Sequence, residues 1–247
     1  MKQHPVLVAL AGMSAACSFE AETEPAEIDY GPLATISVTG RSAEDCTTHW
    51  NGQALTPVQV RERATEGMMA RVEAIGGPQN ITDGSIFSVR FEAASDTPWT
   101  CARSAMEALA AAGVADLQIR PGDERAIPFT RVALPMEEPA VSAPRPLTIA
   151  ANGEMKWSGS TIRIQDFEIL PTIEGVYESV LVVPDDDAPF RPIYDAATAL
   201  HQVGLMAVLP GCGAPGAART PPGGPDLCNQ SPTTVPELGN ATVNATR

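Results

Sequence analysis

Two short stretches decide the fold of this chain: Asp96-Thr97-Pro98-Trp99 and Asp187-Ala188-Pro189-Phe190. The residues that follow them align without a gap at an offset of 91 positions, from Ser104–Leu109 onto Asp195–Leu200. Similarity at a fixed offset is the signature of an internal repeat. The sequence therefore predicts two copies of one small unit.

A second anchor of the repeat lies upstream, where His49-Trp50-Asn51-Gly52 matches Lys156-Trp157-Ser158-Gly159 at an offset of 107. The first copy thus holds 16 more residues between its anchors than the second copy does. Strand-like runs precede both anchors, at 34–38 and 147–150. A Trp followed closely by Gly after such a run indicates a hairpin turn and a small second strand.

The first helix of the unit differs between the copies. In the first copy, Thr56-Pro57-Val58-Gln59 predicts a helix start with a capping box and a proline in the first turn. That helix could run to about Ile75, because Gly76-Gly77-Pro78 would end it. The second copy has only Asp166 to Glu174 here, with Pro171 inside, so its helix should be short or distorted.

A central strand and a second helix complete each copy. We expect the strands at 86–91 and 176–183, and an Asp or Thr to cap each helix with Pro98 or Pro189 in its first turn. Gly113 and Gly204 would end the helices, before last strands at 116–119 and 205–209. Apolar residues recur on one face of each helix at the spacing of a buried face: Trp99, Ala102, Met106 and Leu109; Phe190, Ile193, Ala197 and Leu200.

These patterns predict an α+β fold made of two small β-β-α-β-α-β domains. A run of prolines between the copies is typical of a stiff, extended linker. The expected organisation is a signal peptide with a lipobox-like start at 1–17, an acidic linker at 18–32, domain 1 at 33–125, a Pro-rich linker at 126–146, domain 2 at 147–211, and a disordered Gly/Pro/Thr-rich tail at 212–247.

The first residues are typical of an export signal. Lys2 precedes a short apolar stretch at 5–16, which is too short to span a membrane, because a span needs roughly 20 apolar residues. An N-terminal strand of the fold is disfavoured, since an acidic segment follows at once. Small residues directly before Cys17 are similar to the bacterial lipobox, so Cys17 is either lipidated or lies near a plain cleavage site. We therefore expect a periplasmic protein, tethered to a membrane as a lipoprotein.

Four cysteines remain after Cys17, and an even count in an exported chain favours two disulfides. The expected pairs are Cys46–Cys101 within domain 1 and Cys212–Cys228 in the tail. Zinc binding is the alternative, but no pair has the C-x-x-C spacing of a zinc site. The two histidines beyond the signal, His49 and His201, lie far apart in sequence and suggest no site.

Composition and motifs disfavour several function classes. A formal net charge of −14 argues against binding nucleic acid or anionic lipid through bulk charge. The acidic run 185–187 could be a calcium site, but a solvated loop with one Asp capping a helix explains it better, because the spacing of an EF-hand is missing. Trp50 and Trp157 could anchor a partner, although the edge of the core is their more usual place. No G-x-S-x-G motif occurs, so we expect a non-enzymatic protein with no catalytic, cofactor-binding or metal-binding residues.

The second copy resembles the periplasmic domain of the ExbD/TolR biopolymer-transport family. The resemblance rests on Leu147–Gly159, then on Val180–Asp185, Ile193–Ala197 and Val203–Leu205. There the family has a strand, a Gly turn, a strand, an Asp-bearing loop, a helix, and a Gly before the last strand. It covers about residues 147–210 and, through the repeat, 33–120.

This resemblance implies a role in the cell envelope. Family members are stators of proton-driven motors, and an Asp in their single membrane helix relays protons. The apolar segment at 5–16 is too short for that helix and contains no Asp or Glu, so we expect this chain not to perform the proton step. The periplasmic role could carry over: dimerising, and contacting peptidoglycan or a partner protein. An intramolecular pseudo-dimer and a homodimer both stay open.

Three functions follow as hypotheses. The first is an exported, lipid-anchored, non-catalytic envelope protein that binds proteins or peptidoglycan. The second is an accessory subunit of an ExbD/TolR-type proton-driven transport system. The third and weakest is an enzyme whose site carries no recognisable motif.

Overall fold

The fold is mixed α/β, as seen in a computed structural model that describes residues 31–81, 84–134, 146–172 and 179–210. Cys17, Cys212, Cys228, the predicted signal and the predicted tail lie outside these residues. No helix among the described residues is long and apolar enough to cross a membrane.

The first copy of the repeat folds as a unit of strands and helices in the expected order, with one strand more than predicted. Trp50 ends a strand that precedes the hairpin turn, so two strands flank this turn and a third strand comes before them. The elements are β1 (Thr35–Thr39), β2 (Thr47–Trp50), β3 (Gln53–Leu55), α1 (Pro57–Ala74), η1 (Pro78–Asn80), η2 (Gly84–Phe87), β4 (Val89–Ala93), α2 (Trp99–Ala111) and β5 (Asp116–Pro121).

The second copy repeats this order with a single 3-10 helix in place of α1. The proline at position 171 lies inside that helix, which confirms the prediction of a short or distorted helix. The elements are β7 (Leu147–Ile149), β8 (Met155–Trp157), β9 (Ser160–Thr161), η3 (Ile164–Thr172), β10 (Ser179–Pro184), α3 (Phe190–Gln202) and β11 (Met206–Val208).

The two hairpin turns of the repeat adopt the same backbone conformation. Asn51 and Gly52 have φ values of 49° and 85°, and Ser158 and Gly159 have φ values of 51° and 83°. Positive φ at both central residues is what a two-residue hairpin of this kind requires. The turns predicted from the Trp and Gly positions are therefore confirmed in both copies.

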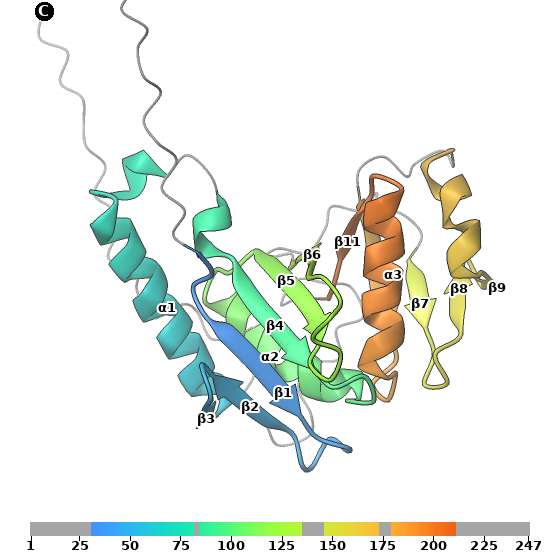
Figure 1. The fold of residues 1–247 in the computed structure, drawn as a ribbon, viewed down its shortest axis with the longest axis horizontal. Helices are drawn as coiled ribbons and strands as arrows, with labels where there is room; N and C mark the ends of the chain where they lie inside the picture. The colour runs from blue at the N-terminus through green and yellow to red at the C-terminus, as the bar shows by residue number, and fades with distance from the viewer. Residues whose placement is uncertain (1–30, 82–83, 135–145, 173–178, 211–247) are drawn as a thin grey trace, which may run out of the picture.

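All the described strands form one sheet, in the order β3-β2-β1-β4-β5-β6-β11-β10-β7-β8-β9 (Figure 1). The second half of this order mirrors the first half. β1, β4 and β5 run parallel to one another, and β6, β11, β10 and β7 form a second parallel set that runs in the opposite direction. The arrangement of two separate small domains is thus not confirmed, because the sheet continues from one copy into the other.

The central strand β6 (Thr130–Ala133) corrects the prediction of an extended linker at 126–146. It pairs antiparallel with β5 and parallel with β11, so it joins the two copies. Its buried residues alternate with less buried ones: Thr130 and Val132 are buried, whereas Arg131 is exposed. The linker therefore begins as a strand of the sheet, and residues 135–145 lie outside the described part.

The helix α1 begins as predicted. The hydroxyl of Thr56 accepts a hydrogen bond from the backbone N–H of Gln59, and the side chain of Gln59 accepts one from the N–H of Thr56. The helix ends after Ala74, close to the predicted glycines. It packs against α2, which lies behind β4 and β5 in Figure 1.

Two other predictions of element boundaries are wrong. Ile86 and Phe87 belong to η2, and the central strand begins only at Val89. Pro98 and Pro189 are the N-caps of α2 and α3 rather than residues of the first turn, and no side chain caps either helix.

One hydrophobic core runs through both copies. Trp99 and Phe190 are 1% and 0% exposed, which confirms that both aromatic residues are core. The ring of Phe190 also lies 6.0 Å from the ring of Phe91 on β4, so the two copies share aromatic contacts. Trp157 is buried and Trp50 packs partly buried against the core, so both tryptophans lie where the edge of the core was expected.

Candidate functional site

The two copies meet where the equivalent loops before α2 and α3 pair with each other. Pro98 and Pro189, which are equivalent at the offset of 91, form an isolated antiparallel bridge. The N–H of Trp99 donates to the carbonyl of Ala188 (2.8 Å), and the N–H of Phe190 donates to that of Thr97 (2.9 Å). Trp99 corresponds to Phe190 in the repeat, and Thr97 corresponds to Ala188, so each of these two hydrogen bonds is the repeat equivalent of the other. An approximate twofold axis therefore passes between the two prolines.

A second pair of backbone bonds obeys the same symmetry. The N–H of Thr100 donates to the carbonyl of Asp186 (2.9 Å), and the N–H of Arg191 donates to the carbonyl of Ser95 (3.0 Å). The first N–H groups of a helix have no partner inside the helix. Here the loop of the other copy supplies the acceptors that a capping side chain would otherwise provide.

The side chains around this axis are not symmetric. In one half, the guanidinium of Arg103 on α2 lies 2.6 Å from a carboxylate oxygen of Asp186 and 3.7 Å from one of Glu107. Only 9% of the Arg103 side chain is exposed, compared with 59% for Asp186. Asp186 therefore pairs with an arginine of the first copy.

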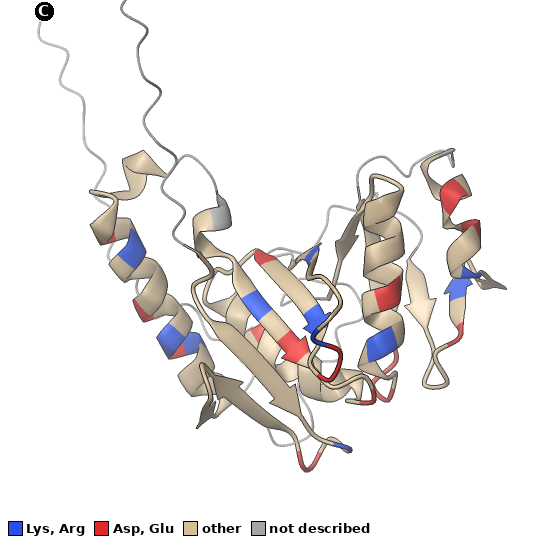
Figure 2. Cartoon of the chain, viewed as in Figure 1, with Lys and Arg blue, Asp and Glu red and all other residues tan. Residues whose placement is uncertain are grey.

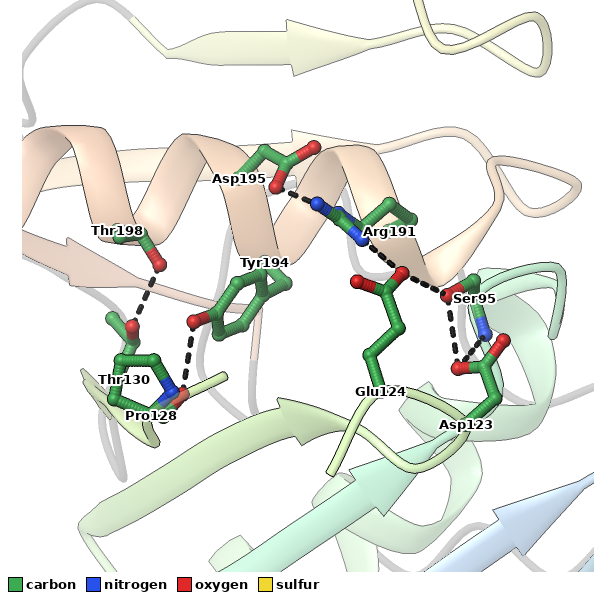
Figure 3. A network of polar contacts seen from close by, with 9 residues as sticks. All are labelled: Ser95, Asp123, Glu124, Pro128, Thr130, Arg191, Tyr194, Asp195 and Thr198. Atoms are coloured by element: carbon green, nitrogen blue, oxygen red, sulfur yellow. Dashed lines mark hydrogen bonds and ion pairs between the residues drawn. The ribbon is translucent and has the colours of Figure 1, made fainter. Parts of the chain in front are cut away.

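In the other half, Ser95 stands at the position equivalent to Asp186 and contacts the loop after β5 (Figure 3). Its hydroxyl oxygen lies within hydrogen-bond distance of a carboxylate oxygen of Asp123 (2.9 Å) and of one of Glu124 (3.2 Å). Glu124 also pairs with Arg191, and the guanidinium of Arg191 bonds to Asp195 on the next turn of α3 at 2.8 Å. A carboxylate of the first copy thus holds an arginine of the second.

These contacts shift the pKa values of the groups involved. The hydrogen bonds to Asp195 and Glu124 raise the pKa of Arg191 above its ordinary value. Burial opposes ionisation of Asp123, but the bonds from the side chain and backbone of Ser95 outweigh it and lower the pKa of this carboxyl. Arg191 and Asp123 are consequently both charged across the physiological range.

Two further bonds attach α3 to the segment around β6 (Figure 3). The hydroxyl of Tyr194 donates to the carbonyl of Pro128 at 2.9 Å, and the hydroxyls of Thr130 and Thr198 lie 2.6 Å apart. Figure 2 shows acidic and basic positions next to each other at the N-terminal end of α3. The junction therefore has the character of a protein–protein interface within one chain, with paired charges around an apolar centre.

The predicted disulfide forms beside a second feature, a hollow in the first copy. Cys46 and Cys101 are bonded, with their Cα atoms 5.3 Å apart. They form one wall of an open hollow of about 370 Å³ between the β2–β3 hairpin, the start of α1 and α2. The remaining lining consists of Thr47, Thr48, Thr56, Ser104 and Gln59 together with Ala54, Leu55 and Pro57.

The structure does not bring the other sequence candidates together. His49 lies on β2 of the first copy, and His201 is exposed in the last turn of α3 in the second. No group of three His, Cys, Asp or Glu side chains within the described ranges could hold a metal ion. Arg103 and Arg191 were not among the residues that the sequence singled out. Arg103 could have been found, because it lies one turn after Trp99 on the buried face of its helix.

The described chain is thus a mixed α/β protein with two paired copies of one unit in a single sheet. Comparisons with protein-family models, with curated proteins and with solved structures found no match for it.

Proposed function

We propose that this chain is an exported, lipid-anchored, non-catalytic protein of the cell envelope that acts by binding protein or peptidoglycan. The observation that carries the proposal is the pairing of the two copies about an approximate twofold axis through Pro98 and Pro189. The periplasmic domains that this chain resembles act as dimers against peptidoglycan or partner proteins. A fused pair of such units would present a comparable two-unit surface.

The disulfide supports export. A bond between Cys46 and Cys101 would be reduced in the cytosol of an ordinary bacterium but would persist in the periplasm. It ties the loop before β2 to α2. The proposal of a lipid anchor rests on Cys17 and its preceding small residues.

Cosedimentation with purified peptidoglycan sacculi tests the binding function. The purified oxidised protein should pellet with sacculi in a saturable manner, and it should stay in the supernatant without them. Bovine serum albumin at the same concentration serves as the control for trapping. Failure to pellet, together with failure to cross-link to any envelope protein in intact cells, would contradict the proposal.

Detergent phase separation tests the anchor. The wild-type protein should partition into the detergent phase, whereas Cys17→Ala should move it into the aqueous phase, because a lipidated cysteine is the attachment point. An unchanged distribution in Cys17→Ala would show that the cysteine carries no lipid.

The alternative function is an accessory subunit of an ExbD/TolR-type proton-driven transport system. Its support is the second copy, where β7, β10 and α3 overlap the residues that carry the resemblance and β11 follows directly after them. Affinity purification from cross-linked membranes separates the two functions. Recovery of motor proteins would favour the accessory subunit, and recovery of peptidoglycan fragments alone would favour the binding protein.

A further inference from the structure

The sheet of the first copy has one face that no described helix covers. Its strands alternate buried residues, which join the core with α1 and α2, with exposed or half-buried residues on the opposite side. In Figure 1, α2 lies behind β4 and β5, and no helix lies in front of β1 and β4. This open face carries Thr35 of β1, Arg90 and Glu92 of β4, Gln118 and Arg120 of β5, and Arg131 of β6.

One row of the open face is rich in hydrogen-bond donors. Thr35 lies beside Arg90 in the strand register. Gln118 lies between Arg90 and Arg131. Neighbouring strands are about 4.8 Å apart, so the backbone positions of the two arginines are separated by about 10 Å. Two guanidinium groups with an amide between them suit an extended segment that carries several carboxylates.

Arg90 is the cation of this row that has no carboxylate beside it. Its side chain is exposed, and its guanidinium forms no ion pair with any residue that the structure describes. The Cζ atom of Arg90 lies 5.1 Å from the centre of the Phe129 ring, which contacts the cation without neutralising it. Arg90 can therefore accept an anionic partner without losing an existing one.

The charges of the open face are positive on balance, although the chain as a whole has a formal net charge of −14. Three arginines stand against two carboxylates on this face. Glu92 pairs with Arg120, and Asp116 pairs with Arg131 at 2.9 Å. The charge of Arg90 is the one that these pairs leave over.

The chain enters the sheet at this row from an acidic segment. The N–H of Leu33 donates to the carbonyl of Ser88 at 2.8 Å, two residues before Arg90, so residues 18–30 join the fold close to the row. The acidic loop at 123–124 follows the opposite end of β5, where its carboxylates contact the junction between the copies. Residues 18–30 contain no Lys or Arg, and their acidic residues are Glu20, Glu22, Glu24, Glu27 and Asp29.

The covalent link makes a weak attraction between this segment and the open face effective. An extended residue spans at most about 3.6 Å, so residues 18–30 can reach over about 40 Å, several times the separation of Arg90 and Arg131. Two groups joined by a short flexible link meet at an effective concentration of the order of millimolar. Single surface ion pairs contribute little, so several carboxylates have to act together.

We propose that the acidic segment 18–30 of this chain docks across the open face, with its carboxylates on Arg90 and along the row toward Arg131. The docking does not rest on the proposed function. In a protein lipidated at Cys17, docking of the residues that follow this cysteine would turn the open face toward the membrane.

Photo-cross-linking in the purified, oxidised full chain tests the docking. The photoreactive residue p-benzoylphenylalanine replaces Gln118, which lies between Arg90 and Arg131. At about 10 mM salt, where charges act over about 30 Å, it should cross-link to residues 18–30, and mass spectrometry of the proteolytic fragments identifies the product. At about 1 M salt, where charges act over about 3 Å, the yield should fall by at least about threefold.

The same photoreactive residue in place of Met69 on α1 is the control for random collisions. Met69 is 55% exposed, and its neighbour Arg71 donates to the carbonyl of Gly31, where the segment joins the fold. A segment that moves freely would therefore reach position 69 at least as often as position 118. The yield at position 118 should exceed that at position 69 at low salt, and equal yields would overturn the proposal.

Arg90→Gln should lower the yield at position 118 by about threefold, because it removes the unpaired charge and keeps a long polar side chain. Arg63→Gln on α1 is the matched control and should leave the yield unchanged, since Arg63 is exposed and pairs with Glu66. An unchanged yield in Arg90→Gln would contradict the proposal. Cross-links between two chains, in place of those within one chain, would assign the open face to a second copy and would also contradict it.

A measurement on the unaltered open face keeps the test decisive where the substitution at Gln118 prevents folding. The side-chain Nε–Hε signal of Arg90 in nuclear magnetic resonance is compared between the wild type and a chain that carries Glu20→Gln, Glu22→Gln and Glu24→Gln. The two Arg90 signals should differ at low salt and coincide at high salt, whereas the signal of Arg63 should be the same in both chains. Identical Arg90 signals at low salt would overturn the proposal.

Discussion

Arg103 connects the two copies at the scale of a single residue. It belongs to a helix of the first copy, its side chain is 9% exposed, and its charge is matched by Asp186 of the second copy and by Glu107 of its own helix. Hydrogen bonds to charged groups contribute more to stability than neutral ones, and removing one partner leaves the other incompletely solvated. The side chain of Arg103 should therefore contribute more to the free energy of unfolding than an arginine in an exposed ion pair does.

The variant Arg103→Ala should lower the free energy of unfolding by about 2 kcal/mol. Arg63→Ala is the control, because Arg63 pairs with Glu66 across an exposed turn of α1, with side chains 55% and 68% exposed. Such a surface pair contributes about 0–1 kcal/mol. Urea denaturation followed by circular dichroism measures both. Equal losses in the two variants would show that the buried position of Arg103 has no special weight.

The hydrogen-bonded carboxylate of Asp45 should make the free energy of unfolding depend on pH in the acidic range. It accepts hydrogen bonds from the backbone N–H groups of Ser42 (2.7 Å) and Arg41 (2.8 Å), which lower the pKa of Asp45 below its ordinary value of 3.8. A carboxyl with a depressed folded-state pKa contributes stability that is fully present above its unfolded pKa. That contribution is lost as the pH falls through the folded-state pKa.

The midpoint of urea unfolding should accordingly fall on acidification below about pH 4, the region of the ordinary Asp pKa. Asp45→Asn should flatten this part of the profile, because the amide does not titrate. Direct titration of the Asp45 carboxyl by nuclear magnetic resonance locates the pKa itself. A profile of Asp45→Asn with the same slope as the wild type would assign the acid sensitivity to other groups.

At the scale of the elements, local signals predicted α1 well and the starts of α2 and α3 poorly. The capping box of α1 is formed by residues three positions apart, so the sequence alone contains it. The starts of α2 and α3 are determined by backbone bonds between loops that belong to different copies of the repeat, and the nearby Asp96 and Asp187 resembled caps. Sequence patterns report local chemistry and do not show which loops meet.

The strand β6 illustrates the other limit of the sequence. Prolines at 128 and 135 flank it, and the density of prolines around it indicated an extended linker. Its alternation of buried and exposed residues, from Thr130 to Val132, was a signal of period two. The whole strand is only four residues long, so the density of prolines outweighed this signal. The hollow beside Cys46 was also beyond sequence reasoning, because three separate elements form it.

The disulfide links the loop before β2 to the helix α2 and predicts a large effect on stability. Replacing both Cys46 and Cys101 by serine should lower the free energy of unfolding by about 4 kcal/mol in the chain-entropy model, because the bond spans a long loop. Denaturation of the wild type with and without a reducing agent should show the same loss. The double variant serves as the control, since a reducing agent should not change its free energy of unfolding. An equal stability of variant and wild type would contradict the expectation.

At the scale of the whole molecule, the shared sheet and core predict that both copies unfold together. Leu109 and Leu200 are equivalent in the repeat, and both are 0% exposed. Leu→Ala in a core costs about 2–5 kcal/mol. Replacing either leucine by alanine should therefore lower the temperature of one unfolding transition shared by both copies, rather than that of one of two separate transitions.

Differential scanning calorimetry checks this prediction. The wild type should give one transition whose calorimetric and van't Hoff enthalpies agree, as two-state unfolding requires. Leu109→Ala and Leu200→Ala should each move that whole transition to lower temperature. Two transitions, of which each variant moves only one, would instead restore the picture of two independent domains.

The junction through Pro98 and Pro189 has a consequence for how this molecule meets others. In a dimer of identical chains, every substitution appears on both sides, so the two ends remain indistinguishable. Here the copies belong to one polypeptide, and they have diverged: one end carries a disulfide and a long helix, whereas the other carries Gly153 against Pro192 and a 3-10 helix. The molecule therefore has a direction, and a partner that spans it can bind in only one orientation.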